Sequence, residues 1–97
     1  MDESMVREHA ERHAQATVAG DLKAAGSDLE KSAFAAAAEV MKHMPPDLTG
    51  SDISGVRSDG DECIVSIVYR SETSSATVES RWAEREGRPK IVDLKVV

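Results

Sequence analysis

Two consecutive prolines, Pro45 and Pro46, separate two parts of the chain that repeat their apolar residues differently. Before the prolines, apolar residues recur every three or four positions, which is the spacing of one face of an α-helix. After them, apolar and polar residues alternate, which is the spacing of a β-strand. Because proline cannot continue a helix, this change of period marks a change of structure. The pattern predicts an α+β fold with N-terminal helices packed on an antiparallel sheet of about four strands.

Three helices are expected in the first part. The first runs from Glu3 to Ala19 and ends at Gly20, since glycine is favoured just past a helix end. A very short second helix, capped by Asp21, is expected to run through Ala25. Ser27 to Glu30 have the Ser-x-x-Glu form of a capping box, so a third helix is predicted to begin there and to stop at Pro45.

Four strands are expected in the second part, over residues 53–58, 62–70, 75–85 and 90–97. Their connections are too short to hold a crossover helix, so the sheet should be antiparallel. The last hairpin is predicted to have a three-residue loop, because this register brings the apolar faces together and sets Trp82 opposite Val92. Trp82 is therefore predicted to be buried beneath the helices. The other pairs expected in this register are Arg85 with Pro89, Arg81 with Asp93, Ser80 with Leu94, Glu79 with Lys95 and Val78 with Val96.

The strand over residues 62–70 has apolar residues on both faces. Ile64 and Val68 belong to one face, while the other face has Cys63, Val65, Ile67 and Tyr69. Helices can cover only one of these faces, and a chain of 97 residues buries a modest core. A homodimer through the outer face of the sheet is therefore predicted.

Charge and composition exclude several classes of partner. The net charge of −6 repels phosphate backbones, and only three residues are aromatic, so nucleic-acid binding is not expected. The N-terminus is charged and no apolar run is long enough to cross a bilayer, so a membrane is not expected as a partner either. Cys63 is the only cysteine, which rules out an internal disulfide and suits a reducing compartment. The chain is read as a single cytoplasmic domain over residues 1–97.

Two local patterns accompany this order of elements: Val18-Ala19-Gly20-Asp21 after the first helix, and Arg81-Trp82-Ala83 followed by Gly87 and Lys90-Ile91-Val92. With them the chain resembles the nuclear transport factor 2-like superfamily, and in particular its SnoaL-like branch with a cystatin-like cone fold. The resemblance implies a curved sheet with helices on its concave side, and homodimers formed through the sheet. It also implies a range of functions, from polyketide cyclases, ketosteroid isomerase and dehydratases to ligand-binding modules and non-catalytic adaptor domains. The strand usually found between the second and third helices is absent, which implies a smaller cavity.

The resemblance implies that an enzyme of this kind would use an inward-facing carboxylate or histidine. Asp93 is expected on the outer face as an ion-pair partner of Arg81, which makes it structural rather than catalytic. His9 and His13 are four residues apart on a helix, but no third ligand is evident and the His-Glu-x-x-His pattern is absent. They are interpreted as partly buried or surface histidines. No catalytic residue is assigned, and neither a cofactor nor a metal is expected.

Four large side chains are candidates for contacts with a ligand: Phe34, Met41, Tyr69 and Trp82. They could line a cavity between helices and sheet, although the Ala-rich third helix favours a filled core over an open pocket. The sequence thus favours a non-catalytic domain that binds a small apolar ligand or a protein partner and acts as a homodimer. The alternative is a small isomerase, cyclase or dehydratase, and the sequence leaves open whether the protein is an enzyme.

Overall fold

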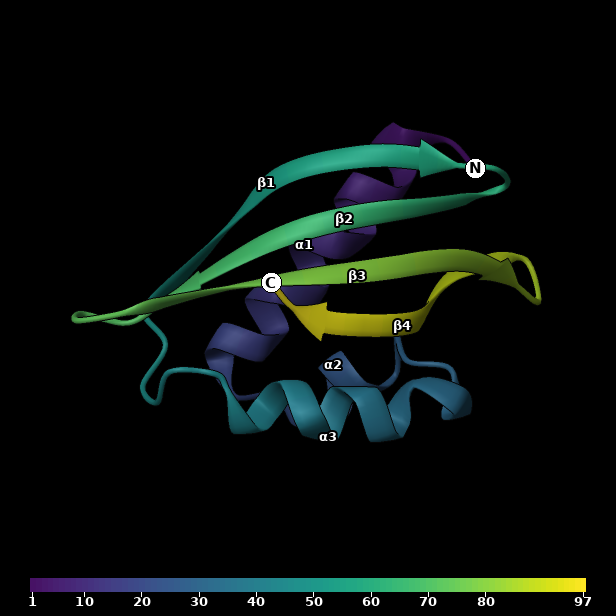
Figure 1. Cartoon of the computed structure of the whole chain (residues 1–97). Helices are drawn as coiled ribbons and strands as arrows, with labels where there is room; N and C mark the ends of the chain where they lie inside the picture. Colours follow the sequence, from purple (N-terminus) through teal and green to yellow (C-terminus); the bar gives the residue numbers. More distant parts are fainter.

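The computed structural model describes residues 1–97 as three helices followed by a four-stranded antiparallel sheet (Figure 1). The helices are α1 (Glu3–Ala19), α2 (Leu22–Gly26) and α3 (Phe34–Lys42), with one turn of 3-10 helix, η1 (Lys31–Ala33), before α3. The strands are β1 (Gly50–Asp59), β2 (Glu62–Arg70), β3 (Ser75–Arg85) and β4 (Arg88–Val96), and they pair in chain order. α1 packs behind β1 and β2, and α3 runs beside β4. The predicted α+β fold is confirmed.

The first two helices begin and end close to the expected residues. α1 stops at Gly20, whose left-handed backbone (φ 76°) lets its N–H donate to the carbonyls of the last turn. Asp21 then caps α2, because its carboxylate accepts the N–H of Ala24 at 3.1 Å. None of the three helices combines the length and the apolar character needed to cross a bilayer.

The third helix does not begin at the predicted capping box. The Ser27 hydroxyl donates to the carbonyl of Ala24 at the end of α2, and α3 starts only at Phe34. Residues 28–30 pair with β4 instead. The N–H of Ile91 donates to the Asp28 carbonyl at 2.7 Å, and the Ile91 carbonyl accepts the N–H of Glu30 at 2.9 Å. This short parallel bridge supplies the backbone partners that a helix start would have needed. The prediction was wrong because it considered only local hydrogen bonds.

The last hairpin differs from the prediction at its loop. The loop has two residues, Glu86 and Gly87, both with positive φ (54° and 80°), as in a type I′ turn. A bulge between Arg81 and Trp82 then shifts the register by one residue, so that Trp82 faces Ile91 and not Val92. Ile91 is accordingly fully buried. Beyond the bulge the predicted pairs are confirmed: Arg81 with Asp93, Ser80 with Leu94, Glu79 with Lys95 and Val78 with Val96.

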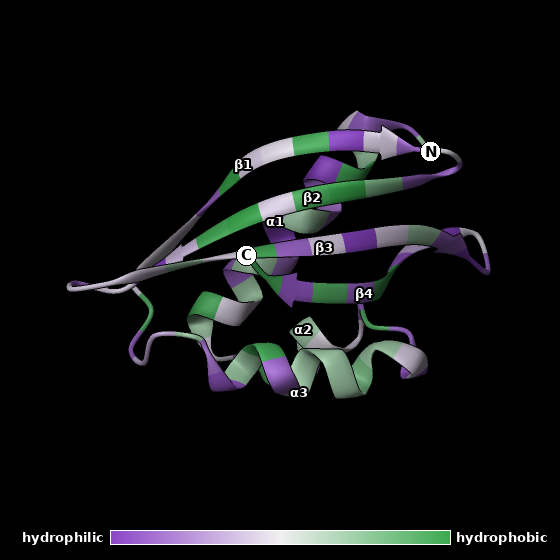
Figure 2. Cartoon of the chain, viewed as in Figure 1, coloured by the Kyte–Doolittle hydropathy of each residue, from purple (hydrophilic) through white to green (hydrophobic).

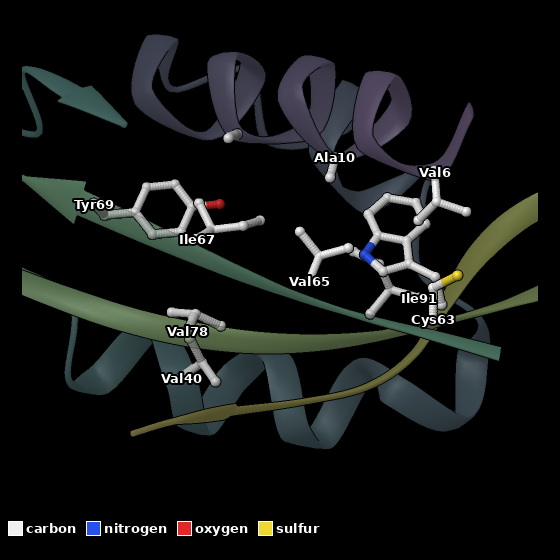
Figure 3. Packing of buried hydrophobic residues seen from close by; sticks show 11 residues of the cluster. Val6, Ala10, Val40, Cys63, Val65, Ile67, Tyr69, Val78 and Ile91 are labelled. Atoms are coloured by element: carbon white, nitrogen blue, oxygen red, sulfur yellow. The ribbon is translucent and has the colours of Figure 1, made fainter. Parts of the chain in front are cut away.

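The core lies between α1 and the inner face of the sheet. Figure 3 shows Ala10 of α1 over Val65 of β2, and Val6 of α1 over Cys63 of β2. Trp82 belongs to the same core cluster and is 0 % exposed. Its indole N–H donates to the Ser80 hydroxyl at 2.9 Å. The predicted burial of Trp82 is therefore confirmed.

The outer face of the sheet has an apolar centre on β2 between charged strands. Ile64 is almost fully buried and Val68 is half-buried, and Figure 2 shows hydrophilic stretches on β3 beside the apolar β2. Ion pairs run across the strands on this face: Arg81 with Asp59 and Glu62, Arg57 and Lys95 with Glu79, and Arg70 with Asp52.

Asp93 lies opposite Arg81, yet the predicted ion pair between them is absent. Arg81 reaches Asp59 at 2.7 Å and Glu62 at 3.0 Å instead, and hydrogen bonds to these two carboxylates raise the pKa of Arg81. The Asp93 carboxylate accepts the N–H of Leu94. This expectation was wrong because two acidic side chains on the β1–β2 side outcompete the cross-strand neighbour.

Candidate functional site

A cavity of about 140 Å³ lies between the three helices and the inner face of the sheet. Its wall is mostly apolar and comes from six elements: α1, α2, α3, β2, β3 and β4. The sequence favoured a filled core here. The space remains because α3 sits beside β4, and because Ala25, Gly26 and Ala37 face the space without long side chains to fill it.

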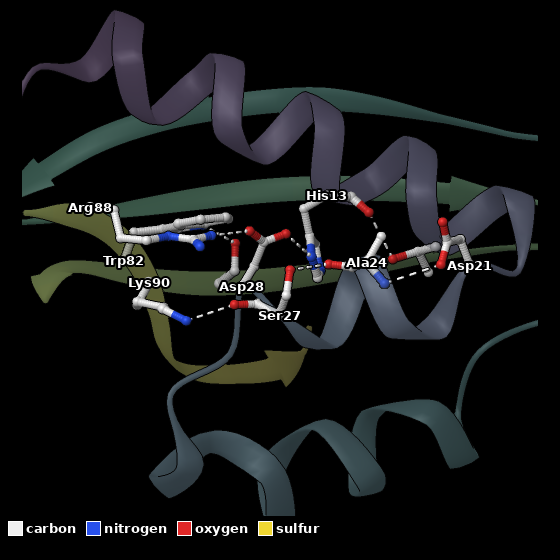
Figure 4. Close-up of polar contacts among 10 residues, drawn as sticks. His13, Asp21, Ala24, Ser27, Asp28, Trp82, Arg88 and Lys90 are labelled. Atoms are coloured by element: carbon white, nitrogen blue, oxygen red, sulfur yellow. Dashed lines mark hydrogen bonds and ion pairs between the residues drawn. The ribbon is translucent and has the colours of Figure 1, made fainter. Parts of the chain in front are cut away.

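His13 forms the polar end of this cavity and is paired with Asp28, which lies behind it outside the wall (Figure 4). His13 of α1 is nearly buried in the cavity wall, and its Nδ1 lies 3.1 Å from Oδ2 of Asp28. The other oxygen of Asp28 accepts a hydrogen bond from Arg88 at 3.0 Å. The His13 ring also stands edge-on to Trp82, with ring centroids 6.0 Å apart and planes at 87°. A continuous polar chain therefore joins α1, the loop after α2 and the β3–β4 hairpin.

The pairing with Asp28 determines which nitrogen of His13 is available. An ionised carboxylate only accepts hydrogen bonds, so Nδ1 donates its proton to Asp28, and in the neutral ring Nε2 carries the free lone pair. Nε2 has no partner within the chain, while every fully buried side-chain nitrogen or oxygen has one. Nε2 is therefore not sealed in the core and can meet a bound polar group.

Tyr69 of β2 provides a second polar atom in the cavity wall. Burial raises the pKa of its hydroxyl to about 12, and the neighbouring Thr17 hydroxyl opposes this shift only in part. The Thr17 hydroxyl donates in turn to the carbonyl of His13 at 2.9 Å. Tyr69 therefore stays protonated at neutral pH and acts as a neutral hydrogen-bond donor.

Two of the four predicted ligand-contact residues meet at the cavity. Met41 and Tyr69 line it, whereas Phe34 is half exposed at the start of α3 and Trp82 packs in the core; neither of these two is part of the wall. His9 is half-buried on α1 and forms no pair with His13.

The polar residues His13, Thr17 and Asp28 were not predicted as site residues. The place of His13 could have been found, since it follows Val6 and Ala10 on the buried face of α1. Asp28 could not, because the backbone bridge to β4 positions it.

The arrangement suits a small molecule that is apolar over most of its surface and has one polar group. His13, with Asp28 behind it, also has the form of a general base, a proton acceptor held in one tautomer by a carboxylate. No three His, Cys, Asp or Glu side chains lie close enough together to hold a metal ion. Comparisons of the chain with models of protein families, with curated proteins and with solved structures found no match.

Proposed function

We propose that this protein binds a small, mostly apolar molecule with one hydrogen-bonding group, in the cavity between its helices and sheet. One observation carries the proposal: the apolar cavity has His13, Thr17 and Tyr69 in its wall. Its volume of about 140 Å³ is close to that of cavities, about 150 Å³, that hold a benzene-sized molecule. The polar group would meet Nε2 of His13 or the hydroxyl of Tyr69, and the apolar body would contact α2 and α3.

Filling the cavity is expected to abolish this binding. In a thermal-shift screen of small apolar molecules, a ligand at a hundred times its Kd should stabilise the native protein by about 2.7 kcal/mol. Ala37→Phe places a ring in the cavity and should remove the shift, because Ala37 is part of the wall. Ala35→Phe is the matched control, since Ala35 is exposed on the same helix, is not part of the cavity wall and should leave the shift intact. Equal shifts in both variants would mean that the ligand binds elsewhere.

A second candidate function is proton-transfer catalysis by a small isomerase, cyclase or dehydratase. It is favoured by the nearly buried His13, which pairs with Asp28 at 3.1 Å beside the cavity. A paired histidine of this kind accepts a proton from a substrate and returns it at another atom. Turnover of a bound molecule that His13→Gln abolishes, with binding retained, would select the enzyme. Binding without turnover would select the ligand-binding domain.

The resemblance to the nuclear transport factor 2-like superfamily, and to its SnoaL-like branch, is proposed as the evolutionary origin of the fold. Its support is the order of elements, with N-terminal helices on one face of an antiparallel sheet. A cytoplasmic location is proposed as well. It is supported by the single free cysteine, Cys63, which suits a reducing compartment.

The proposed homodimer uses the outer face of the sheet. Its support is the half-buried Val68 within a frame of charged side chains, since an apolar centre with a polar rim is the composition of many interfaces. Sedimentation equilibrium should therefore give the mass of two chains. Val68→Glu should give one chain, because it would bury a charge at the interface, whereas Thr73→Glu in the exposed β2–β3 loop should not. A monomeric mass for the native protein at high micromolar concentration would refute the dimer.

A further inference from the structure

We infer that the ligand is a single-chain amphiphile longer than the cavity, with its uncharged polar head at His13 and its apolar tail leaving between α2 and α3. This inference rests on the proposed function, because it assigns a ligand class to the same cavity. Three features carry it: the exposed apolar side chains at the mouth, the apolar surface of α3 beyond them, and the small volume of the cavity.

The mouth of the cavity lies between two large apolar side chains. Leu22 of α2 and Met41 of α3 both line the cavity, yet Leu22 is 63 % exposed and Met41 is 51 % exposed. Wall residues that are open to solvent mark where the cavity meets the surface. Leaving two such side chains in water is unfavourable, and an apolar tail that passes between them would cover both.

The surface of α3 continues this apolar path. Phe34 is 51 % exposed and lies seven residues before Met41, which places it two turns away, about 10 Å along the same side of the helix. Ala38 is exposed between them, and Figure 2 shows that α3 is apolar over most of its length. Phe34, Ala38 and Met41 form a ledge without a charged residue, and this ledge begins at the mouth.

The cavity is too small to enclose a ligand of ordinary size, so part of such a ligand would have to lie on this ledge. Binding sites for drug-sized molecules typically measure about 300–1,000 Å³, whereas this cavity measures about 140 Å³. The cavity can hold the head and the first part of a chain, and the rest must lie outside. An anionic head is disfavoured because the protein has a net charge of −6 and Asp28 stands next to His13. A cationic head would lose its hydration in the mostly apolar wall, so the head should be uncharged. An alcohol or a carbonyl compound with an unbranched tail fits these conditions.

A series of straight-chain primary alcohols, from butan-1-ol to decan-1-ol, tests the inference by isothermal titration calorimetry. Affinity for the native protein should rise about fourfold per methylene along the whole series, since each methylene leaves water. The double variant Phe34→Ser/Ala38→Ser should bind the short alcohols as the native protein does, because neither residue is part of the cavity wall. For the longest members it should lose at least tenfold in affinity. Met5→Ser is the matched control, because Met5 is exposed on α1 and is not part of the cavity wall.

The outcomes separate the ligand class from the proposed function. If short alcohols bind but affinity stops rising once the cavity is full, the tail path is refuted while the cavity remains a binding site. The tail path is also refuted if Met5→Ser weakens long alcohols as much as the double variant does, because the gain with length would then come from the general surface. If no alcohol binds, the short ones included, the proposed function fails and the inference fails with it.

Discussion

Trp82→Ala is expected to lower the free energy of unfolding by about 3–5 kcal/mol. Trp82 has the largest side chain in the core and is 0 % exposed. Its removal would leave a void between α1 and β3 that the surrounding backbone cannot close, because α1 is held against the sheet along its length. The change would also remove the hydrogen bond to Ser80 and the edge-on contact with His13. The loss should therefore affect both the core and the polar end of the cavity.

Urea unfolding followed by far-ultraviolet circular dichroism measures this loss. Domains of this size have unfolding free energies of about 5–15 kcal/mol, so Trp82→Ala could leave too little folded protein for a reliable fit. Trp82→Phe keeps a ring in the core and should cost less than Trp82→Ala while remaining folded. Glu84→Ala, two residues along β3 and exposed, should change stability by less than about 0.5 kcal/mol. A loss below 1 kcal/mol for Trp82→Ala would contradict the burial of the indole.

Much of the fold was predictable because its determinants are local. The change of period at Pro45 placed the helices and strands in the right order, and Gly20 marked the end of α1. Strand parity also identified the buried face of β3, and with it Trp82. The β3–β4 loop was wrong by one residue, yet the register beyond Arg81 was right. The loop is one residue shorter than predicted and the bulge adds one residue, so the two differences cancel beyond Arg81. The pattern of apolar faces fixes only the combined length of loop and bulge, and it does not show how that length is divided between them.

The candidate site was less predictable because it depends on contacts between distant segments. Tyr69 and Met41 were expected there since each lies on the inner side of its element. The pair of His13 and Asp28 depends on the bridge between Leu29 and Ile91, which joins segments more than sixty residues apart. No pattern of neighbouring residues predicts such a bridge. The Ser-x-x-Glu sequence of residues 27–30 indicated the start of a helix instead. The volume of the cavity depends likewise on where α3 rests against β4, which is a result of tertiary packing.

Alkaline pH is expected to destabilise the protein through Tyr69. The pKa of its hydroxyl is raised from 10.0 to about 12 in the folded protein because burial disfavours the phenolate. The folded state thus holds this proton more tightly than the unfolded state does. The resulting contribution to the free energy of unfolding is complete below pH 10 and is lost as the pH rises to about 12. Two pKa units correspond to a loss of about 3 kcal/mol across that interval.

The measurement is clean because Tyr69 is the only tyrosine in the chain. Tyrosinate absorbance should rise at higher pH in the native protein than in urea, and its rise should coincide with any loss of far-ultraviolet circular dichroism. Tyr69→Phe removes the titrating group and keeps the ring, so its unfolding free energy should fall less between pH 10 and pH 12. A native tyrosinate signal with its midpoint near pH 10 would show that the hydroxyl is open to water. The wall of the cavity on β2 would then be solvated, and the apolar site proposed beside it would lose its main support.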